Sequence, residues 1–334
     1  MKTTLMLIGT IVFLVVSSCD EQVQVITNGA QLPVVYSLFN PADSLISVRL
    51  TKTFSGAESA EVMAQNPNNL YYANAEVSMD INSKEGYPIT SYKFEKTKLP
   101  DKAEGFFTSD PNYCYCLKGP LNLLFSEGFQ IRLLVRIPES NQLISAQQNY
   151  YAPPVIQLPR TSNQTRFSLY SPEAPRIKWI DKFGFQRYSL IIRLKYINRF
   201  QELEETRNFD VSFRKESGIF KPDQEPISIL HFFDGDDFLR RIGGGIPVDP
   251  GIISRSFVSI DLIVVGLSRE YCDYEDTNQI APDRQGLPVS NIIGGIGLFA
   301  LRVSKEQGGY LLDPVSLDSL VHGRHTKQLK FVKW

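Results

Sequence analysis

Histidine is the side chain that most often serves as a metal ligand or a general base near neutral pH, and this chain has only three. Two of them stand close together in His322-Gly323-Arg324-His325, near the C-terminus. A zinc site usually needs four ligands, so two histidines alone leave it incomplete. We therefore predict no metal site here and assign the segment to a solvated tail.

A second polar cluster, Asp234-Gly235-Asp236-Asp237, has the oxygen ligands that calcium prefers. A calcium loop places such ligands at several fixed positions and ends in a bidentate Glu, which nothing after Asp237 provides. Carboxylates at the start of a helix accept hydrogen bonds from its free N–H groups and suit its positive end. We therefore predict that Asp234 or Asp236 caps a short helix over 237–242, which the glycines of 243–245 end.

Residues 295–300 read Gly-Ile-Gly-Leu-Phe-Ala and match the dinucleotide-binding pattern G-x-G-x-x-G/A. That pattern binds a pyrophosphate only where it joins a strand to the N-terminus of a helix. Here Leu301-Arg302-Val303 continues as a strand and no βαβ unit is visible, so we predict no nucleotide cofactor. The glycines are expected instead to allow a tight turn or the close approach of another strand.

Three cysteines, Cys114, Cys116 and Cys272, lie in the body of the chain. On a strand, Cys114 and Cys116 share a face, at a separation near the limit of about 7 Å for a disulfide. A Cys-x-Cys pair alone is also a poor zinc site. We predict buried thiols, with or without one bridge to Cys272.

The residue with the clearest chemical role is Cys19. Lys2 supplies a positive charge, residues 5–16 form an almost unbroken apolar run, and Val16-Ser17-Ser18-Cys19 ends it. This pattern is typical of a secretory signal, and the run is shorter than the roughly 20 apolar residues that span a bilayer. We predict a signal peptide over 1–18 that ends in a bacterial lipobox, with palmitate-type acylation of the thiol. The alternative is an ordinary signal peptide followed by an incidental cysteine.

The sequence predicts no cofactor apart from the covalent lipid on Cys19, and this lipid has a physical consequence. One saturated chain binds a membrane only at about 10⁴ M⁻¹, whereas two or more hold it firmly. Asp20 and Glu21 follow at once, in a lipidated tether over 19–33. In lipoproteins of Bacteroidota, acidic residues at this place resemble the signal for the outer face of the outer membrane. The alternative is a solvated acidic tether.

Composition and motifs exclude several classes of function. The formal charge is −1 and the pI about 6.4, so nothing in the charge favours nucleic acid. Hydrophobic residues make up 43% of the chain, which is enough to form a core. No G-x-S-x-G, H-E-x-x-H or P-loop motif occurs. We therefore predict no catalytic residue and no enzyme, with a surface hydrolase built on two carboxylates brought together in space as an alternative.

Short alternating segments separated by Gly, Pro, Asn or Asp predict a mainly β chain. Strands are expected at 34–38, 45–53, 75–81, 90–96, 105–108, 113–117, 130–137, 142–148, 177–180, 187–197, 209–213, 227–233 and 254–267, and short helices at 57–65, 237–242 and 269–275. The proline-rich segment 150–160 predicts a domain boundary. We expect two antiparallel β-sandwich-like domains with a few short helices. An immunoglobulin-like or prealbumin-like sandwich would span 23–152, and a second β-rich domain with the glycine motif would span 153–334.

The glycine motif and the first hairpin resemble a known family. Asn291-Ile292-Ile293-Gly294-Gly295-Ile296-Gly297-Leu298-Phe299 is similar to the C-terminal hallmark of a Bacteroidota outer-membrane lipoprotein family of unknown function. The segments 33–44 and 48–54 are similar to its first hairpin. The resemblance implies an outer-membrane accessory protein, often accompanying TonB-dependent receptors, and no catalytic residue. Its structural motif corresponds here to Asn291, Gly294, Gly295, Gly297 and Phe299.

These observations lead us to expect a non-catalytic, surface-exposed outer-membrane lipoprotein that binds a ligand or supports a TonB-dependent uptake system. The lipid anchor makes the outer membrane its first partner, and the ligand is not determined. A fimbrial or adhesin-type subunit, which would assemble by strand addition, is the alternative. Asp43-Ser44-Leu45 and Asp318-Ser319-Leu320 also match the short O-glycosylation pattern of this phylum.

Overall fold

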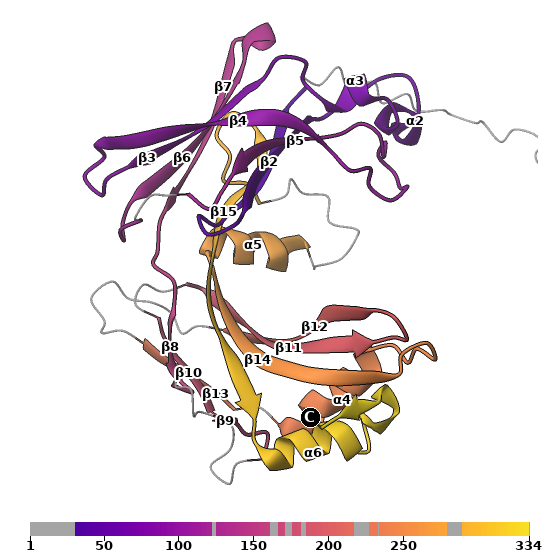
Figure 1. The fold of residues 1–334 in the computed structure, drawn as a ribbon. Coiled ribbons are helices and arrows are strands. Elements are labelled where there is room, and N and C mark those ends of the chain that lie inside the picture. The colour runs from indigo at the N-terminus through magenta and orange to yellow at the C-terminus, as the bar shows by residue number, and fades with distance from the viewer. Residues whose placement is uncertain are drawn as a thin grey trace, which may run out of the picture.

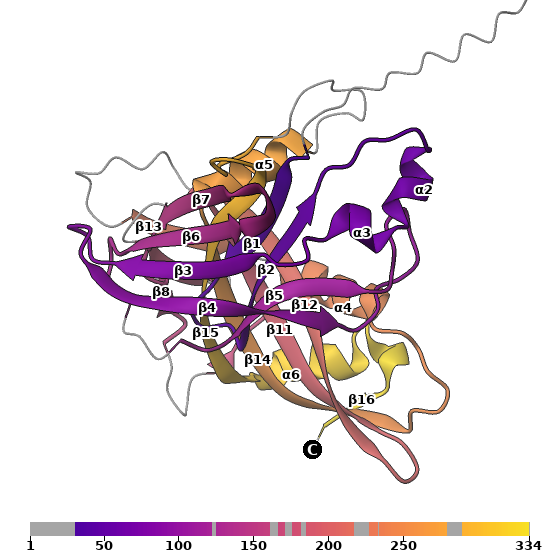
Figure 2. The ribbon, with the colours of Figure 1, turned by 90° about the horizontal axis from the view of Figure 1, so that it is seen from above.

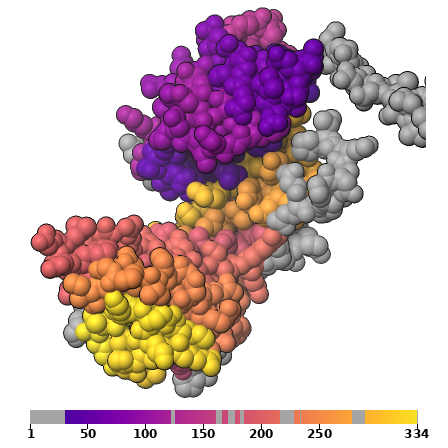
Figure 3. Space-filling model, turned by 90° about the vertical axis from the view of Figure 1, so that its right-hand side faces the viewer, coloured from indigo at the N-terminus to yellow at the C-terminus, as the bar shows by residue number. Residues whose placement is uncertain are grey.

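A computed structural model describes residues 31–333 except 122–124, 161–165, 171–175, 182–184, 217–226, 233 and 279–288. The described chain is mainly β, with short helices, which confirms the predicted fold class. It forms two lobes (Figure 1), and the space-filling view shows an indigo-to-magenta lobe above a red-to-yellow one, with a narrower waist between them (Figure 3). The segments that cross this waist decide how the two lobes sit.

The first lobe is built from seven strands that follow one another around a strongly curved sheet (Figures 1 and 2). Their order is β1-β2-β5-β4-β3-β6-β7. The predicted hairpin is confirmed, because β1 pairs antiparallel with β2 and Asn40 Nδ2 donates to Asp43 Oδ1 at 2.8 Å in the turn. The strands are β1 (Pro33–Phe39), β2 (Leu45–Lys52), β3 (Glu76–Asn82), β4 (Pro88–Leu99), β5 (Asn112–Lys118), β6 (Gln130–Ile137) and β7 (Gln142–Asn149).

One long strand, β15 (Ile296–Leu312), belongs to both lobes. Its first part pairs in parallel with β1, from Val34↔Ile296 to Phe39↔Leu301, and its second part pairs antiparallel with β14, beginning at Leu267↔Arg302. The predicted boundary at 152/153 is therefore crossed by a strand from the C-terminal part of the chain. Because the strand is continuous, it fixes the orientation of one lobe against the other.

The second lobe is organised around two long strands, β11 (Arg187–Arg199) and β14 (Ser254–Leu267). β14 is buried on both faces, whereas β11 is buried on one face and half-buried on the other. The face that carries Tyr188, Leu190, Ile192 and Leu194 has no exposed area at these side chains. Burial of β14 on both faces explains why the predicted strand at 254–267 contains the apolar run Leu262-Ile263-Val264-Val265. The other strands are β8 (Val155–Leu158), β9 (Arg166–Phe167), β10 (Arg176–Asp181), β12 (Glu204–Glu216), β13 (Ile227–Phe232) and β16 (Phe331–Val332).

The helix predicted after the acidic cluster forms, but its glycines do not end it. Asp234 is the N-cap, as predicted, and its side chain accepts from the N–H of Asp236 at 2.8 Å. Helix α4 (Gly235–Gly245) then runs through all three glycines. A Cβ on Gly243 would lie 1.9 Å from the His325 carbonyl oxygen, and one on Gly245 would lie 2.2 Å from the Phe209 ring. These glycines therefore permit close packing of the helix, which the sequence pattern did not indicate.

Two other predictions were wrong in the first lobe. The strand expected at 105–108 is a loop, and its Phe106 and Phe107 side chains are exposed. The helix expected at 57–65 is shorter: α2 (Ala60–Ala64) ends at Gln65, and a separate turn, α3 (Pro67–Leu70), follows under an Asn66 cap. Alternation of apolar residues over a few positions does not separate a strand from a loop that exposes them.

In the second lobe, three segments differ from the sequence analysis. The strand predicted at 209–213 begins earlier, since β12 starts at Glu204, and the predicted helix at 269–275 extends as α5 (Arg269–Asn278). The predicted tail is folded, because α6 (Pro314–His322) and β16 lie within it. The His325 ring nitrogen Nε2 lies 3.4 Å from Asp236 Oδ2.

Candidate functional site

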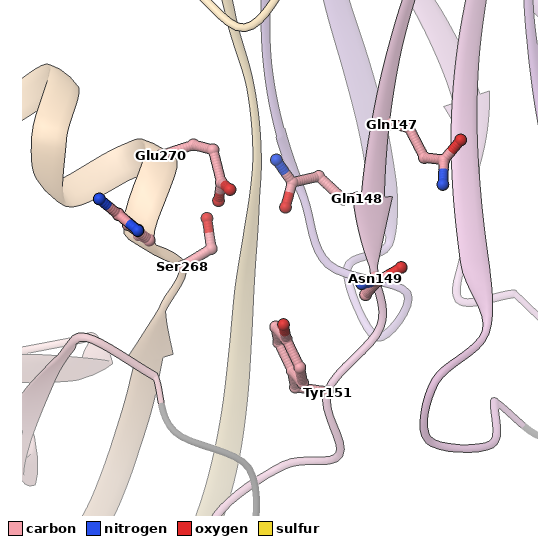
Figure 4. Close-up of a pocket in the computed structure, with 7 residues that line it drawn as sticks. Gln147, Gln148, Asn149, Tyr151, Ser268 and Glu270 are labelled. Carbon is pink, nitrogen blue, oxygen red and sulfur yellow. The ribbon is translucent and has the colours of Figure 1, made fainter. Parts of the chain in front are cut away.

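A polar cleft lies at the waist, where three segments distant in sequence converge (Figure 4). The end of β7 contributes Gln147, Gln148 and Asn149, and the connector that follows contributes Tyr151. The start of α5 contributes the segment Ser268–Glu270. The enclosed space is about 330 Å³.

A second hollow continues from the first, because both are lined by Asn149 and Tyr151. Its other walls are Lys84, after β3, and the segment Glu127–Gln130 before and within β6, and it measures about 450 Å³. The backbone N–H of Gly128 donates to the Tyr150 carbonyl at 3.0 Å, and Gln130 Nε2 donates to the Lys84 carbonyl at 3.3 Å. We call the two hollows together the Tyr151 cleft.

Two buried side chains of the cleft lining, those of Gln148 and Ser268, are already bonded to β15. Gln148 Nε2 donates to the Phe299 carbonyl at 2.9 Å. Ser268 donates its N–H to the Leu301 carbonyl at 3.0 Å, and its hydroxyl accepts from the Leu301 N–H at 3.3 Å. Ser268 is only 2% exposed. Its hydroxyl therefore completes the strand edge and is not placed as a nucleophile.

Tyr151 stands on the connector with its hydroxyl directed into the cleft (Figure 4). Its ring meets Phe185 edge-on, with centroids 5.7 Å apart, which fixes the ring without using the hydroxyl. Burial, and then the negative charge of Glu270, raise the pKa of Tyr151 above its ordinary value. The neutral phenol can both donate and accept a hydrogen bond across the pH range in which a cell works.

The charged side chains of the cleft balance one another. Lys84 and Arg269 are cationic, whereas Glu127 and Glu270 are anionic. Arg269 Nε also donates to Asp273 Oδ2 at 3.3 Å, one turn along α5. Among the residues that line the two hollows there is neither a histidine nor a cysteine. The arrangement can hold a molecule by several hydrogen bonds, and it assembles no nucleophile–base pair.

Helix α5 is fastened to the sheet beside the cleft by a buried cation. The Arg187 side chain is 4% exposed, and it donates to Glu275 Oε2 at 2.7 Å and to both Asp276 oxygens at 2.8 and 2.9 Å. Arg187 is the main cause that lowers the pKa of Asp276, and Arg214 adds to it. These bonds fasten the C-terminal half of α5 to β11, and Glu270 lies in the first turn of the same helix.

The glycine motif lies next to the cleft, at the seam where the curved sheet nearly closes. Ser145 of β7 and Ile293 exchange backbone hydrogen bonds of 3.0 and 2.8 Å. The Asn291 side chain accepts from the Phe299 N–H at 2.9 Å and donates to the Phe299 carbonyl at 2.6 Å. Asn291 thus replaces a neighbouring strand at the open edge of β15.

The glycines of the motif meet backbone so closely that a side chain would not fit. Gly297 has φ +124°, and a Cβ there would lie 2.0 Å from the Val35 carbonyl oxygen. Gly294 has φ +80°, and a Cβ on Gly295 would lie 2.7 Å from the Pro33 carbonyl oxygen. β15 continues as a strand after the motif, which is not the strand–helix junction that binds a dinucleotide.

The three cysteines of the body of the chain are buried free thiols, and no bridge joins them. Cys114 and Cys116 lie on β5, whereas Cys272 lies on α5 against Ile263 and Val265. Burial, and then the neighbouring Cys116 thiol, raise the pKa of Cys114 to about 11. The Cys114 thiol is therefore protonated and unreactive at neutral pH.

Several predicted sites lie elsewhere. Cys19, Asp20 and Glu21 fall outside the described residues, so lipidation and the export signal stay predictions. Ser44 is exposed in the β1–β2 turn, whereas the Ser319 hydroxyl donates to the Val315 carbonyl within α6.

The described part of the chain has neither a metal-binding cluster nor a membrane-spanning helix. No group of three or more His, Cys, Asp or Glu side chains there is arranged to hold a metal ion. Within the same residues, every helix is too short or too polar to cross a bilayer.

Comparison with known proteins gives little. No family model matches the sequence, and the search of curated proteins found no match. Three solved structures are similar to parts of the chain, each at a TM-score of 0.20. A DUF4785 family protein from Legionella pneumophila has 13% identity, and the match covers 69% of this chain and 51% of that one. E. coli alpha-2-macroglobulin has 10% identity, with 71% of this chain and 13% of that one covered, and the C-terminal globular domain of an oligosaccharyltransferase from Pyrococcus abyssi has 10% identity, with 85% and 47% covered. The chain thus spans about half the length of the first of them. Likenesses at this level carry no inference.

The sequence analysis missed the cleft. Its lining residues come from positions 84, 127–130, 147–151 and 268–270, and no local motif marks any of them. The only local signal was the aromatic, proline-rich connector after β7, which was interpreted as a boundary. A boundary that turns the chain between two lobes is also a place where small-molecule sites form.

Proposed function

We propose that this protein is a lipid-anchored accessory protein of the outer membrane that binds a small polar ligand in the Tyr151 cleft without transforming it. The observation that carries the proposal is the polar, charge-balanced cleft between two β-rich lobes. Its two hollows, about 330 and 450 Å³, fall in the range of roughly 300–1,000 Å³ that is usual for small-molecule sites.

The lining suggests the chemistry of the ligand. Two cations and two anions surround the amides of Gln147 and Asn149, so a ligand of strong net charge would meet repulsion from one pair. A neutral molecule with many hydroxyl or amide groups, or a zwitterion, would satisfy all of them. The Tyr151 hydroxyl would add one donor and one acceptor.

The location rests on the sequence. Residues 1–19 have the signal and lipobox pattern, and Asp20 and Glu21 support display on the outer face. A protein held there with a ligand-binding cleft suits the supply of a solute to a TonB-dependent transporter, which is the partner that the family resemblance implies. We expect that transporter to co-purify with the detergent-extracted, full-length protein.

The fimbrial alternative has less support. Strand addition requires a free sheet edge. Among the described strands the large sheet ends in β12 and β7, and β7 is already bonded at Ser145 to Ile293. β12 itself carries many charged side chains. Among them are Glu204, Arg207 and Lys215, which are exposed, and Glu205, which is half-buried. Charges on an edge strand oppose pairing with another chain.

The location is tested by mass spectrometry of the N-terminal peptide of the mature protein, together with protease treatment of intact cells. We expect acyl chains on Cys19 and cleavage of the protein at the cell surface. A Cys19→Ala variant should lose its membrane attachment. An unmodified Cys19 in a protein that stays in the cytosol would overturn the proposed location.

Binding is tested by thermal-shift screening of the full-length protein against neutral oligosaccharides, zwitterionic dipeptides and dicarboxylates. We expect a hit in one of the first two groups and none among the dicarboxylates. A Glu270→Gln variant should weaken the hit, whereas Glu202→Gln, on an exposed turn of the second lobe, should not. A hit that both variants retain equally would place binding outside the cleft.

A further inference from the structure

A small apolar surface stands on the first lobe, away from the cleft. Val62 of α2 is 55% exposed, and Phe106 and Phe107 of the loop between β4 and β5 are 51% and 47% exposed. The two phenylalanine rings meet edge-on, with centroids 5.2 Å apart. We call these three side chains the Phe106 patch. Large apolar side chains that cluster in water mark a surface made for a partner.

The loop that carries the patch is held in place by α2. Gln65 Nε2 donates to the carbonyls of Gly105 and Phe106, at 3.0 Å each, and the Thr108 N–H donates to the Ala64 carbonyl at 3.1 Å. Thr108 and Ala64 are buried. The phenylalanines are therefore presented by a fixed framework, and turning them inward would break these bonds.

The patch is close to the point where the N-terminal tether joins the fold. Leu32 and Thr53 are joined by two hydrogen bonds of 2.8 and 2.9 Å, and only five residues lie between Thr53 and Ser59, the N-cap of α2. The eleven residues between Cys19 and Gln31 can span at most about 40 Å when fully extended. A lipid on Cys19 thus holds this side of the lobe within reach of the bilayer surface.

We propose that the Phe106 patch is a second membrane contact, which enters the interfacial layer of the leaflet that holds the Cys19 lipid. The inference rests on the lipid anchor of the proposed function. Phenylalanines enter the boundary between headgroups and acyl chains, and a lysine beside them can keep its ammonium at the headgroups. Lys102 is such a lysine, because its Nζ lies 5.7 Å from the centre of the Phe107 ring.

The charges around the patch indicate which lipids it would meet. Glu61 precedes Val62, and Glu104 lies two residues before Phe106, so Lys102 is outnumbered. The contact would therefore be hydrophobic and would suit zwitterionic headgroups better than anionic ones.

Contact through the patch would also orient the protein. The turn between β3 and β4 lies at the end of the first lobe opposite α2 in both ribbon views (Figures 1 and 2). Lys84 of that turn lines the Tyr151 cleft. With α2 at the bilayer, this side of the cleft would face away from the lipid, toward the medium.

The test uses the full-length, acylated protein reconstituted in phosphatidylcholine vesicles, with and without brominated acyl chains. A Phe107→Trp variant reports contact of the patch, and Tyr87→Trp is its matched control, because Tyr87 is 71% exposed in the β3–β4 turn. We expect bromine to reduce the Phe107→Trp emission roughly twofold more than that of the control, as for a ring within the interfacial layer. Bromine should quench the emission of a Val62→Trp variant as strongly as that of Phe107→Trp. Agreement between the two variants would show that the result does not come from misfolding of one of them.

The two proposals fail in different ways. If mass spectrometry finds acylated Cys19 and the vesicles retain the protein, but bromine quenches both patch variants no more than Tyr87→Trp, the membrane contact is wrong and the anchor stands. An unmodified Cys19 would overturn the anchor and this inference together. Stronger quenching of Phe107→Trp and Val62→Trp, with retention on the vesicles, would support both.

Discussion

The glycine seam and the Tyr151 cleft lie side by side along β15 and use similar side chains in opposite ways. At the seam, Asn291 and Gln148 give their amides to the Phe299 backbone, and the glycines leave no free space. In the cleft, only Gln148 and Ser268 are bonded to the strand, and the other polar groups surround open space. The fold therefore requires the polar groups of the seam, whereas most polar groups of the cleft are available to a ligand.

The seam should be the more sensitive region, and Gly297→Ala tests this most severely. A Cβ there would lie 2.0 Å from the Val35 carbonyl at a φ of +124°. We expect the free energy of unfolding to fall by about 3 kcal/mol or more, measured by urea denaturation. Gly105→Ala is the control, since a Cβ there meets nothing within 4 Å. Equal stability of the two variants would contradict the role of the seam.

Asn291→Ala should have the next largest effect. It removes both hydrogen bonds to Phe299 and leaves the N–H of a fully buried residue without its side-chain acceptor. We expect a loss of about 2 kcal/mol in the same assay. Asn208→Ala, on the exposed part of β12, should change little. A similar small change in Asn291→Ala would mean that water replaces the amide.

The attachment of α5 links the two regions and should depend on pH. Because Arg187 lowers the pKa of Asp276 below its ordinary value of 3.8, the folded state favours the carboxylate. Its contribution is present above about pH 4 and is lost as the pH falls through the lower folded value. We expect Asp276→Asn to be less stable than the wild type at pH 7 and to approach it near pH 2.

A second variant controls for the effect of low pH on the other carboxylates of the protein. Asp273→Asn changes another carboxylate of α5, whose ion-pair partner Arg269 is largely exposed. At pH 7 the free energy of unfolding of Asp273→Asn should be closer to that of the wild type than the value for Asp276→Asn is. A stability gap for Asp276→Asn that is the same at both pH values would show that the ion pair with Arg187 does not hold the helix.

The smallest effects on stability are expected in the cleft itself. Glu270→Gln and Tyr151→Phe remove groups that make no backbone bond to β15, so each should change the free energy of unfolding by less than about 0.5 kcal/mol. Both should nevertheless weaken the ligand found by thermal-shift screening. A large loss of stability in either variant would mean that the cleft is part of the structural core.

Local chemistry was sufficient for much of the fold. The strand over 254–267 was predicted with the bounds that β14 has, because Phe257, Ile260 and the apolar run 262–265 indicate a deeply buried strand. The β1–β2 hairpin and the Asp234 cap followed from turn and capping residues that act within a few positions. The exposed phenylalanines of 105–108 were misjudged, because an apolar pattern does not say whether a partner within the chain will cover it.

By itself the sequence determined where most of the strands lie and where α4 begins, since both depend on neighbours along the chain. The export-type signal before Cys19 stays a prediction. Only the tertiary structure decided that Val34 pairs with Ile296, that Gly243 and Gly245 allow close packing within α4, and that Tyr151 and Glu270 line the same cleft. These arrangements join residues far apart in the sequence. They depend on how the sheet curves and how the lobes meet, which no local pattern encodes.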